Sequence, residues 1–336
     1  MKRSASPRPA LAVLGALYAL VLAAGWIAPY DVHEQNRDLA WAPPTRPRFV
    51  DAEGRFQLRP FVYRQVERPG RFGQYVEDRS RAYPLRFFVT RPSTGRRHLF
   101  GVDGEARVFL LGADRFGRDQ LSRLLHGGRV SLGAGLLAGL LAVALGIAAG
   151  TAAGFYGGWI DAATMRLGEL FMALPWLYLL LAVRAVLPLD LTPAGAFLAT
   201  TAVVGTLSWV RPARLVRGVV LSAREREFVL AARGFGASDL YLLRRHVLPQ
   251  AAAVVLTQLA LLVPRLVLAE VTLSFLGLGV AEPTPSWGNM LAALRQVHVL
   301  TSYWWASAPA AALVAVVLSY HRLASALQQL LGKPTP

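Results

Sequence analysis

Two ionisable side chains stand inside a long apolar stretch of the chain. Arg265 and Glu270 lie between residues 250 and 279, a segment that is otherwise almost wholly apolar. A charged side chain at the centre of a bilayer costs about 2.5–3.5 kcal/mol on insertion scales, so such residues are functional candidates. On one helix the two would lie about 140° apart, which favours partners on other helices. We expect either an interhelical salt bridge or snorkelling, or a role in lining or gating a translocation pathway.

The other reactive residue types form no catalytic, metal or cofactor site. The absence of cysteine excludes disulfides and thiolate chemistry. The six histidines lack the spacing of metal ligands, and no GxxxxGK[ST] stretch is present to hold ATP phosphates. Asp114 and Asp119 near Arg115 and Arg118 have the composition of an acid/base pair, but nothing else in the sequence supports catalysis there.

The sequence REREFVLAARGFGASDLYLLRRHVLPQ, from Arg224 to Gln250, predicts a helix, a kink and a second helix. One helical face holds Phe228, Ala231, Ala232 and Phe235. Gly236 can end this helix in a left-handed conformation, and Ser238 can N-cap a second helix beginning at Asp239. Pro249 marks the turn into the next apolar segment. The pair offers a small-residue patch to a partner protein, or it is simply an amphipathic helix at the membrane interface.

Six apolar segments are candidates to position these residues as membrane spans. A spanning helix needs about 20 mostly apolar residues. The candidates lie at 10–30, 130–154, 168–188, 194–210, 250–279 and 304–322. The first follows the basic leader MKRSASPRP, and we expect an uncleaved anchor because its apolar run is long for a signal peptide. Hydrophobic residues make up 54% of the chain, above the ~45–50% of soluble proteins.

Five glycines follow one face of the second candidate span, at Gly135, Gly139, Gly146, Gly150 and Gly154. Small residues at this spacing let helices approach closely in lipid, where apolar burial gives no drive for association. We expect this face to pack against neighbouring helices.

Arginine placement predicts the orientation of the spans and the organisation of the chain. Eight arginines lie between Arg211 and Arg245, whereas the connections near 190 and at 280–303 hold only Arg295. We therefore place both termini and the arginine-rich loop in the cytoplasm. The predicted parts are the N-terminus and first span (1–30), an outer segment (31–129), a five-helix core (130–327) with a cytoplasmic loop (211–249), and a tail (328–336).

The outer segment is predicted to fold. It carries nineteen arginines and twelve acidic residues, and segments longer than about 60 residues translocate largely regardless of charge. Aromatic and β-branched residues between EG, TG and DG turn signals predict strands from residue 48 to residue 112. The fold class is therefore an all-α polytopic membrane protein of about six transmembrane helices with a β-rich extracytoplasmic insert.

The pattern LAARGFGAS…HVLP resembles the cytoplasmic "EAA" loop of binding-protein-dependent ABC importers. In that family the loop is a coupling helix that docks into a groove on the ATPase subunit. The resemblance assigns ATPase coupling to Phe228, Ala231, Ala232, Gly236, Ala237, Ser238, Asp239, His246, Leu248 and Pro249. Leu230 departs from the pattern, because the family usually has Glu there.

Three further stretches narrow the resemblance to the C-type permease of the dipeptide/oligopeptide/nickel importer group. They are LGADRFGRDQLSRLLHGGRVSL (111–132), GFYGGWIDAATMRLGELFMALP (154–175) and AEVTLSFLGLGVAEPTPSWGNML (269–291). The likeness covers nearly everything from residue 111 to about 291. It does not cover the β-rich insert or the tail SYHRLASALQQLLG.

The resemblance implies the type I ABC importer permease fold and a multi-pass subunit of the cell inner or plasma membrane. It implies four partners: a second homologous permease, two cytoplasmic P-loop ATPases that hydrolyse the ATP, and an extracytoplasmic solute-binding protein. The expected function is ATP-driven import of peptides or similar small solutes by alternating access. In the family, Asp114 and Asp119 belong to a structural outer motif.

Other functional classes fit the sequence less well. The net charge of +16 could indicate nucleic acid, but the arginines are interleaved with long apolar runs. A membrane-embedded enzyme with an extracytoplasmic active site remains the alternative, and it would need carboxylates or histidines converging on outer loops. An ion channel would need a polar stripe along a span, whereas these spans are apolar and rich in glycine.

Overall fold

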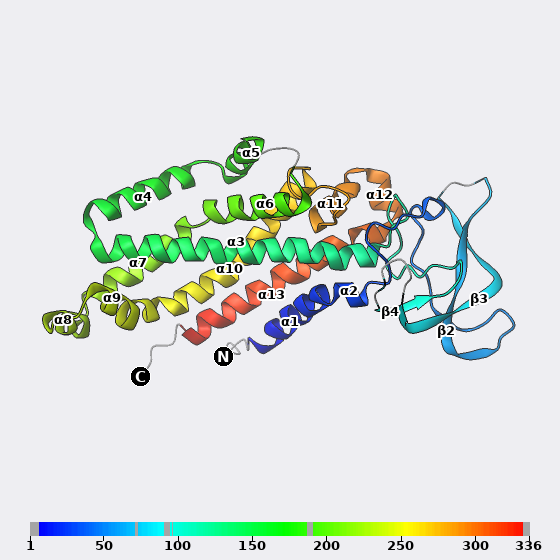
Figure 1. Ribbon diagram of the computed structural model, residues 1–336, viewed down its shortest axis with the longest axis horizontal. Coiled ribbons are helices and arrows are strands. Elements are labelled where there is room, and N and C mark those ends of the chain that lie inside the picture. Colours follow the sequence, from blue (N-terminus) through cyan, green and yellow to red (C-terminus); the bar gives the residue numbers. More distant parts are fainter. Residues whose placement is uncertain (1–6, 71–72, 91–94, 96, 187–190, 332–336) are drawn as a thin grey trace. The chain divides into compact units, whose positions relative to one another are not determined.

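The computed structural model describes residues 7–70, 73–90, 95, 97–186 and 191–331, and Figure 1 labels its elements. The chain divides into two compact units. Unit 1 contains the described residues of 1–14, 133–270 and 315–336, and unit 2 contains those of 15–132 and 271–314. Four helices belong partly to each unit: α1 (Arg8–Leu22), α3 (Gln120–Tyr156), α10 (Leu248–Phe275) and α13 (Ala308–Leu331).

The other helices of unit 1 follow α3 in the chain. They are α4 (Gly158–Ala173), α5 (Trp176–Val186), α6 (Pro193–Leu207), α7 (Val210–Arg224), α8 (Glu227–Gly234) and α9 (Asp239–Leu242), with a π-helical turn at Leu243–Val247. Unit 2 adds α2 (Ala24–Ile27), α11 (Trp287–Leu291), α12 (Val297–Ser302) and 3-10 turns at Arg37–Leu39, Ala292–Arg295 and Trp304–Ser307.

Three helical segments of the described chain are long and apolar enough to cross a membrane. They are Gln120–Tyr156, Asp239–Phe275 and Trp304–Leu330. The pair α6 and α7 becomes a fourth candidate if it is one broken span, bent by 42°. Helix α1 is apolar, but its 15 residues fall short of the usual ~20. The prediction of six spans is therefore met only in part, by three or four candidates.

The predicted span at 168–188 is wrong as a single helix. Helix α4 ends at Ala173 and α5 begins at Trp176, and the last two residues of the predicted span lie outside the described residues. The break follows from Pro175, which disfavours helical geometry in the residue before it. Leu174 accordingly has an extended ψ of 135°.

The arginine-rich stretch after residue 210, predicted as the start of a cytoplasmic loop, begins with a helix. Thr192 N-caps α6 by accepting a hydrogen bond from the Gly195 amide, and Pro193 occupies the first turn. After the bend at Ser208 and Trp209, α7 continues with Val210, Ala213 and further buried residues on one face. Helix amphipathicity explains this helix, because the arginines of α7 lie between residues that face the core.

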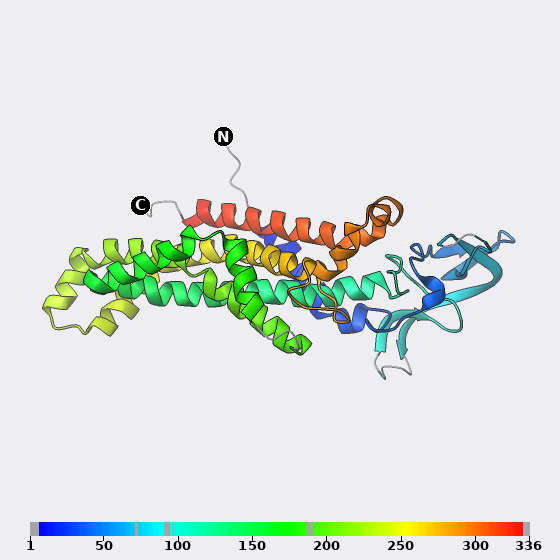
Figure 2. The ribbon, with the colours of Figure 1, turned by 90° about the horizontal axis from the view of Figure 1, so that it is seen from above.

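The glycine face of α3 packs closely in unit 1, as the sequence predicts. A β-carbon on Gly150 would lie 2.3 Å from the carbonyl oxygen of Ala213 on α7. A β-carbon on Gly135 would lie 2.9 Å from the Val267 nitrogen on α10. Both views show this part of α3 beside α10 (Figure 1; Figure 2). The two distances confirm the packing role, since no side chain fits between these backbones.

Unit 2 contains a four-stranded antiparallel sheet within the segment predicted to be β-rich. Its strands β1 (Arg48–Val50), β2 (Phe56–Glu67), β3 (Tyr75–Thr90) and β4 (Arg97–Val102) pair in sequence order. Val62 lies opposite Tyr83, and Phe87 lies opposite Phe100. The sheet core comprises Val62, Tyr83, Leu85, Ala106 and Val108. Burial of these side chains stabilises the sheet without any disulfide.

Candidate functional site

The loop between α8 and α9 adopts the conformation that its sequence predicts. The Gly236 φ angle is +84°, a left-handed value that glycine tolerates best. The amides of Phe235 and Ala237 donate to the carbonyls of Ala231 and Ala232, which satisfies the end of α8. Ser238 N-caps α9 by accepting from the Tyr241 amide at 3.4 Å. The predicted C-terminal glycine and serine cap are both confirmed.

One side of the α8–α9 segment is anchored in an apolar core of unit 1. Val229, Leu242 and Val247 are fully buried there, beside Phe155 of α3 and Val220 of α7. The predicted coupling residues Ala232 and Ala237 pack against this core. The segment is therefore tied to the long helices rather than loosely attached. The burial of Val229 was not predicted from the sequence, although the position of Val229 in the helical period indicates a core-facing residue.

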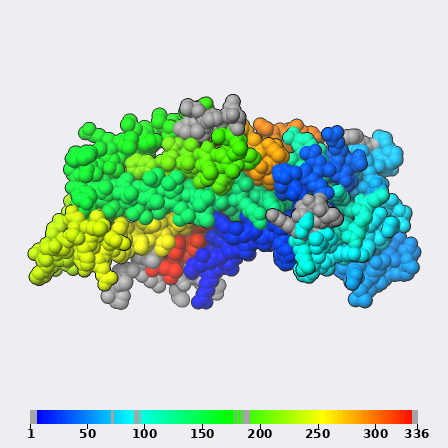
Figure 3. All heavy atoms as spheres, viewed as in Figure 1, coloured from blue at the N-terminus to red at the C-terminus, as the bar shows by residue number. Residues whose placement is uncertain are grey.

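The other side of the α8–α9 segment carries large apolar side chains that are exposed in this chain. They are Phe228 (45% exposed), Leu230 (51%), Phe235 (92%), Leu240 (63%) and Tyr241 (52%). Figure 3 shows this segment in yellow, open on the face in view. We call these five residues the docking patch. An exposed apolar cluster of this kind marks an interaction site more often than a bare surface.

The remaining predicted coupling residues lie around the docking patch. The ring of His246 contacts the rings of Phe228 and Tyr241, with centroids 5.7 and 5.6 Å away. Ala231 is exposed, and Asp239 lies 3.9 Å from Arg233. Leu248 and Pro249 lie in the first turn of α10.

Pro249 does not mark a turn, contrary to the sequence prediction. The chain from Asp239 to Phe275 forms one continuous helical segment, with the π-helical turn Leu243–Val247 just before the proline. A proline inside a continuous helix removes one backbone donor, so one hydrogen bond of the helix is lost at Pro249. The preceding π turn accommodates the missing donor in a helix that continues.

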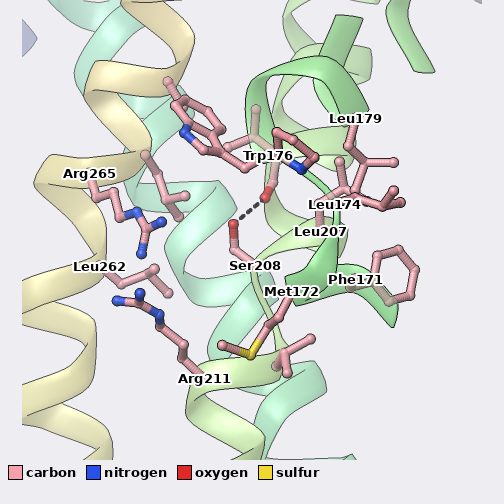
Figure 4. Close-up of a pocket in the computed structure, with 15 residues that line it drawn as sticks. Phe171, Met172, Leu174, Trp176, Leu179, Leu207, Ser208, Arg211, Leu262 and Arg265 are labelled. Atoms are coloured by element: carbon pink, nitrogen blue, oxygen red, sulfur yellow. Dashed lines mark hydrogen bonds between the residues drawn. The ribbon is translucent and has the colours of Figure 1, made fainter. Parts of the chain in front are cut away.

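Arg265 lines a cavity of about 330 Å³ in unit 1. Figure 4 shows its guanidinium group and that of Arg211 directed into the same space, among Leu262, Met172 and Trp176. Arg211 was missed by the sequence analysis. Its place at the start of α7 is fixed by the bend at Ser208 and Trp209, which sequence periodicity does not reveal.

Glu270 occupies a different environment from Arg265, although both lie on α10. Its side chain is only 2% exposed, whereas Arg265 is exposed. Glu270 is not among the residues that line the Arg265 cavity. The two predicted pathway residues therefore do not share one site, in agreement with the 140° between them on a helix.

A second ionic site lies in unit 2, where two sequence motifs meet. Arg118 donates to Asp114 at 2.7 Å and to Glu282 at 2.7 and 3.2 Å. Arg123 donates to Glu282 at 2.9 Å. The Arg118 and Arg123 side chains are only 3% and 1% exposed. This arrangement locks the stretch at 111–132 to the stretch at 269–291.

Glu282 remains ionised in this cluster. Burial by itself would raise the pKa of Glu282, but hydrogen bonds and charge attraction from Arg118 and Arg123 outweigh it and hold the pKa below its ordinary value of 4.5. Asp119 has a different role, because its carboxylate accepts from the amide and hydroxyl of Ser122 at the start of α3. The structural reading of Asp114 and Asp119 thus agrees with their contacts, and Glu282 was the residue missed.

Comparison with known proteins decides what class of molecule holds these sites. The pattern of the "Binding-protein-dependent transport system inner membrane component" family matches residues 142–333, more than half of the chain. The chain belongs to this family. The match includes the docking patch and both arginines of the cavity, and it begins after the four-stranded sheet. The chain is thus a membrane permease component of an ABC importer.

Named relatives are similar to more than half of the chain. A "Putative peptide permease protein" of Brucella ovis is 38% identical over 218 residues, covering 65% of this chain and 70% of the relative. The "Glutathione transport system permease protein GsiD" of Escherichia coli O1:K1 is 37% identical, covering 68% and 73%. The "Dipeptide transport system permease protein DppC" of Bacillus subtilis is 35% identical, covering 58% of each.

Proposed function

We propose that this permease component imports peptides, or similar small solutes, together with a second homologous permease, two P-loop ATPase subunits and a solute-binding protein. The observation that carries the proposal is the family match across residues 142–333, which includes the α8–α9 segment. The three relatives above bear the names of peptide, glutathione and dipeptide permeases, which supports the substrate class.

The docking patch is proposed to receive motion from one ATPase. Its exposed Phe235 and Leu240 offer apolar area to a groove on a partner, and the buried Val229, Leu242 and Val247 transmit a displacement to α3 and α7. Closure of the ATPase dimer would push this rigid segment, and rigid-body motion of the helices would alternate access to the pathway. The chain itself would break no bond.

The coupling role predicts a specific effect of strain at Gly236. Gly236→Val places a β-branched side chain at a φ of +84°, which costs about 1–3 kcal/mol locally. The variant should insert in the membrane and assemble, but hydrolyse ATP with little transport. Gly234→Val is the matched control, because Gly234 has no positive φ and a β-carbon added there would meet no neighbour within 4 Å. Unimpaired coupling in Gly236→Val would contradict the placement of the kink.

We further propose the full topology of six spans, with both termini and α8–α9 in the cytoplasm and the four-stranded sheet outside. The chain lacks cysteine, so single substitutions report their own location. Leu58→Cys on β2 is at a 90% exposed position and Phe235→Cys at a 92% exposed position. In intact cells, or in spheroplasts if an outer membrane is present, an impermeant thiol reagent should label the first and spare the second. Equal labelling before lysis would contradict this topology.

The sheet is proposed to contact the solute-binding protein. Phe56 and Leu58 are 70% and 90% exposed on β2, and Phe56 stacks on Phe49 of β1 with ring centroids 6.3 Å apart. Replacing Phe56 and Leu58 with serine should weaken binding-protein affinity while the basal ATPase activity is kept. Deletion of residues 48–108 with unchanged transport and unchanged affinity would contradict the proposal.

The first experiment is affinity purification of the tagged chain in mild detergent, followed by uptake in proteoliposomes. We expect one homologous permease and two ATPase chains to co-purify. With the binding protein outside and ATP inside, a radiolabelled di- or tripeptide should accumulate. Recovery of the chain alone under several gentle conditions, or no peptide uptake by an intact complex, would contradict the proposed function.

A further inference from the structure

The Arg211–Arg265 cavity forms at two helix breaks of unit 1 and beside a proline inside a third helix. Its lining includes Leu174 and Pro175 at the break between α4 and α5, and Ser208 at the break between α6 and α7. Arg265 directly follows Pro264, a proline inside α10 that removes one backbone hydrogen bond. In secondary membrane transporters, substrate sites characteristically form at such discontinuous helices near the bilayer midplane.

The wall of this cavity is apolar and aromatic apart from the two arginines and one hydroxyl. Phe171, Met172, Trp176 and Leu262 are among the large side chains of this wall (Figure 4). The hydroxyl of Ser208 donates to the Val204 carbonyl at 2.7 Å, so its proton is already used. The described residues that line the cavity include no aspartate or glutamate.

The two guanidinium groups lie close enough for their like charges to repel each other. In the described part of the chain, neither Arg211 nor Arg265 forms an ion pair. They also line a second hollow of about 380 Å³, which adds only Arg214 and Gln258 as polar residues. Arg214 lies 3.8 Å from the carboxylate of Glu169, so among the described residues the charge without an acidic partner is that of Arg211 and Arg265.

The position of Arg265 along α10 makes this charge costly. It lies ten residues before the end of the helix at Phe275, or about 15 Å at 1.5 Å per residue. Half of a ~30 Å hydrocarbon core is the same length, so a span ending near Phe275 holds Arg265 near mid-depth. Two like charges at that depth favour the binding of any anion that can enter the cavity.

We propose that Arg211 and Arg265 form an anion subsite for the C-terminal carboxylate of a peptide cargo during translocation. The inference rests on the proposed peptide import. Guanidinium groups bind carboxylates through paired hydrogen bonds, and two of them suit both oxygens of one carboxylate. The aromatic and thioether wall accepts the adjoining apolar side chain. Arg211 follows the bend between α6 and α7, whereas Arg265 lies on α10, so a change in this bend alters their separation and releases the anion.

The test measures peptide binding to the permease itself. The complex of both permeases and both ATPases is placed in nanodiscs of net-neutral lipid without the binding protein. Binding of a radiolabelled apolar tripeptide and of its C-terminal amide is measured up to millimolar concentration, nucleotide-free and vanadate-trapped. We expect the free acid to bind at least about ten-fold more tightly than the amide. Arg211→Gln and Arg265→Gln should each bring that ratio close to one while leaving amide binding unchanged.

Arg214→Gln is the matched control, since Arg214 lines only the second hollow and should keep the wild-type ratio. No preference for the acid in the wild type, no binding in either state, or equal loss for both peptides would overturn the proposal. The last result would indicate a structural role, such as pairing with an acidic residue of the partner permease. ATP-driven uptake in the presence of the binding protein is measured in a separate assay. If uptake persists while the acid is not preferred over the amide, the anion subsite is contradicted and the proposed import function is not.

Discussion

The two arginine pairs of this permease component occupy opposite electrostatic environments. Arg118 and Arg123 are almost fully buried, and both donate to Glu282 within 3 Å. Arg211 and Arg265 line an open cavity whose described wall holds no carboxylate. Arginine thus neutralises a buried acid in unit 2, whereas in unit 1 its positive charge is available to an incoming anion.

The difference teaches that a charge in an apolar sequence is not by itself a functional site. A buried and fully paired arginine fixes geometry, and its loss leaves an uncompensated partner. A cavity-lining arginine without an acid lowers the energy of any anion that enters. Only the second arrangement is able to bind and release a ligand.

The largest expected effect comes from removing the acid of the buried cluster. Glu282→Gln leaves Arg118 and Arg123 with Asp114 alone, so the complex should lose about 2–3 kcal/mol of unfolding free energy. The value is below the ~3–5 kcal/mol of a fully buried pair because the Glu282 side chain is 36% exposed. Thermal unfolding in detergent measures it, with exposed Glu225→Gln as control. Equal, small decreases in thermal stability for both variants would contradict the difference between the two arginine pairs.

An intermediate effect is expected from pH. The folded pKa of Glu282 is depressed, so unfolded chains take up the proton first as pH falls. The stability from this cluster is therefore complete above pH 4.5, and it is lost as pH falls through 4.5 towards the lower folded pKa. Thermal midpoints from pH 7 to pH 4 should drop more for wild type than for Glu282→Gln. Parallel curves would show that Glu282 is not held ionised by its arginines.

The smallest expected effect on stability comes from the cavity. Arg265→Gln removes one of two repelling charges and breaks no ion pair in the described structure, so the unfolding free energy should stay within about 0.5 kcal/mol or rise slightly. The comparison with Glu282→Gln is made in the same thermal assay. A loss as large as that of Glu282→Gln would mean that Arg265 has an acidic partner in the assembled complex.

Local chemistry was predictable from the sequence, and contacts between distant segments were not. Gly236 and Ser238 act on neighbours a few residues away, so their types alone predicted the kink and the cap. Glu282 meets Arg118 across 164 positions of the chain, and no periodicity signals such a pair.

Bends were the second source of error. Pro175 was visible in the sequence, yet the apolar composition around it outweighed the break in predicting one span. The arginines of α7 were used to predict orientation, and the helix shown by buried residues such as Val216 and Val220 was not predicted. Arg211 could be placed in the cavity only once that helix and its bend were known.

Crosslinking from the docking patch tests the central claim most directly. In the cysteine-free chain, Phe235→Cys and Leu58→Cys introduce thiols at positions of nearly equal exposure, 92% and 90%. The assembled complex is treated with a short bifunctional thiol–amine reagent, and the captured subunit is identified by mass spectrometry. We predict that Phe235→Cys captures an ATPase subunit and that Leu58→Cys does not. Capture of the ATPase from Leu58→Cys, or none from Phe235→Cys in an intact complex, would contradict the account.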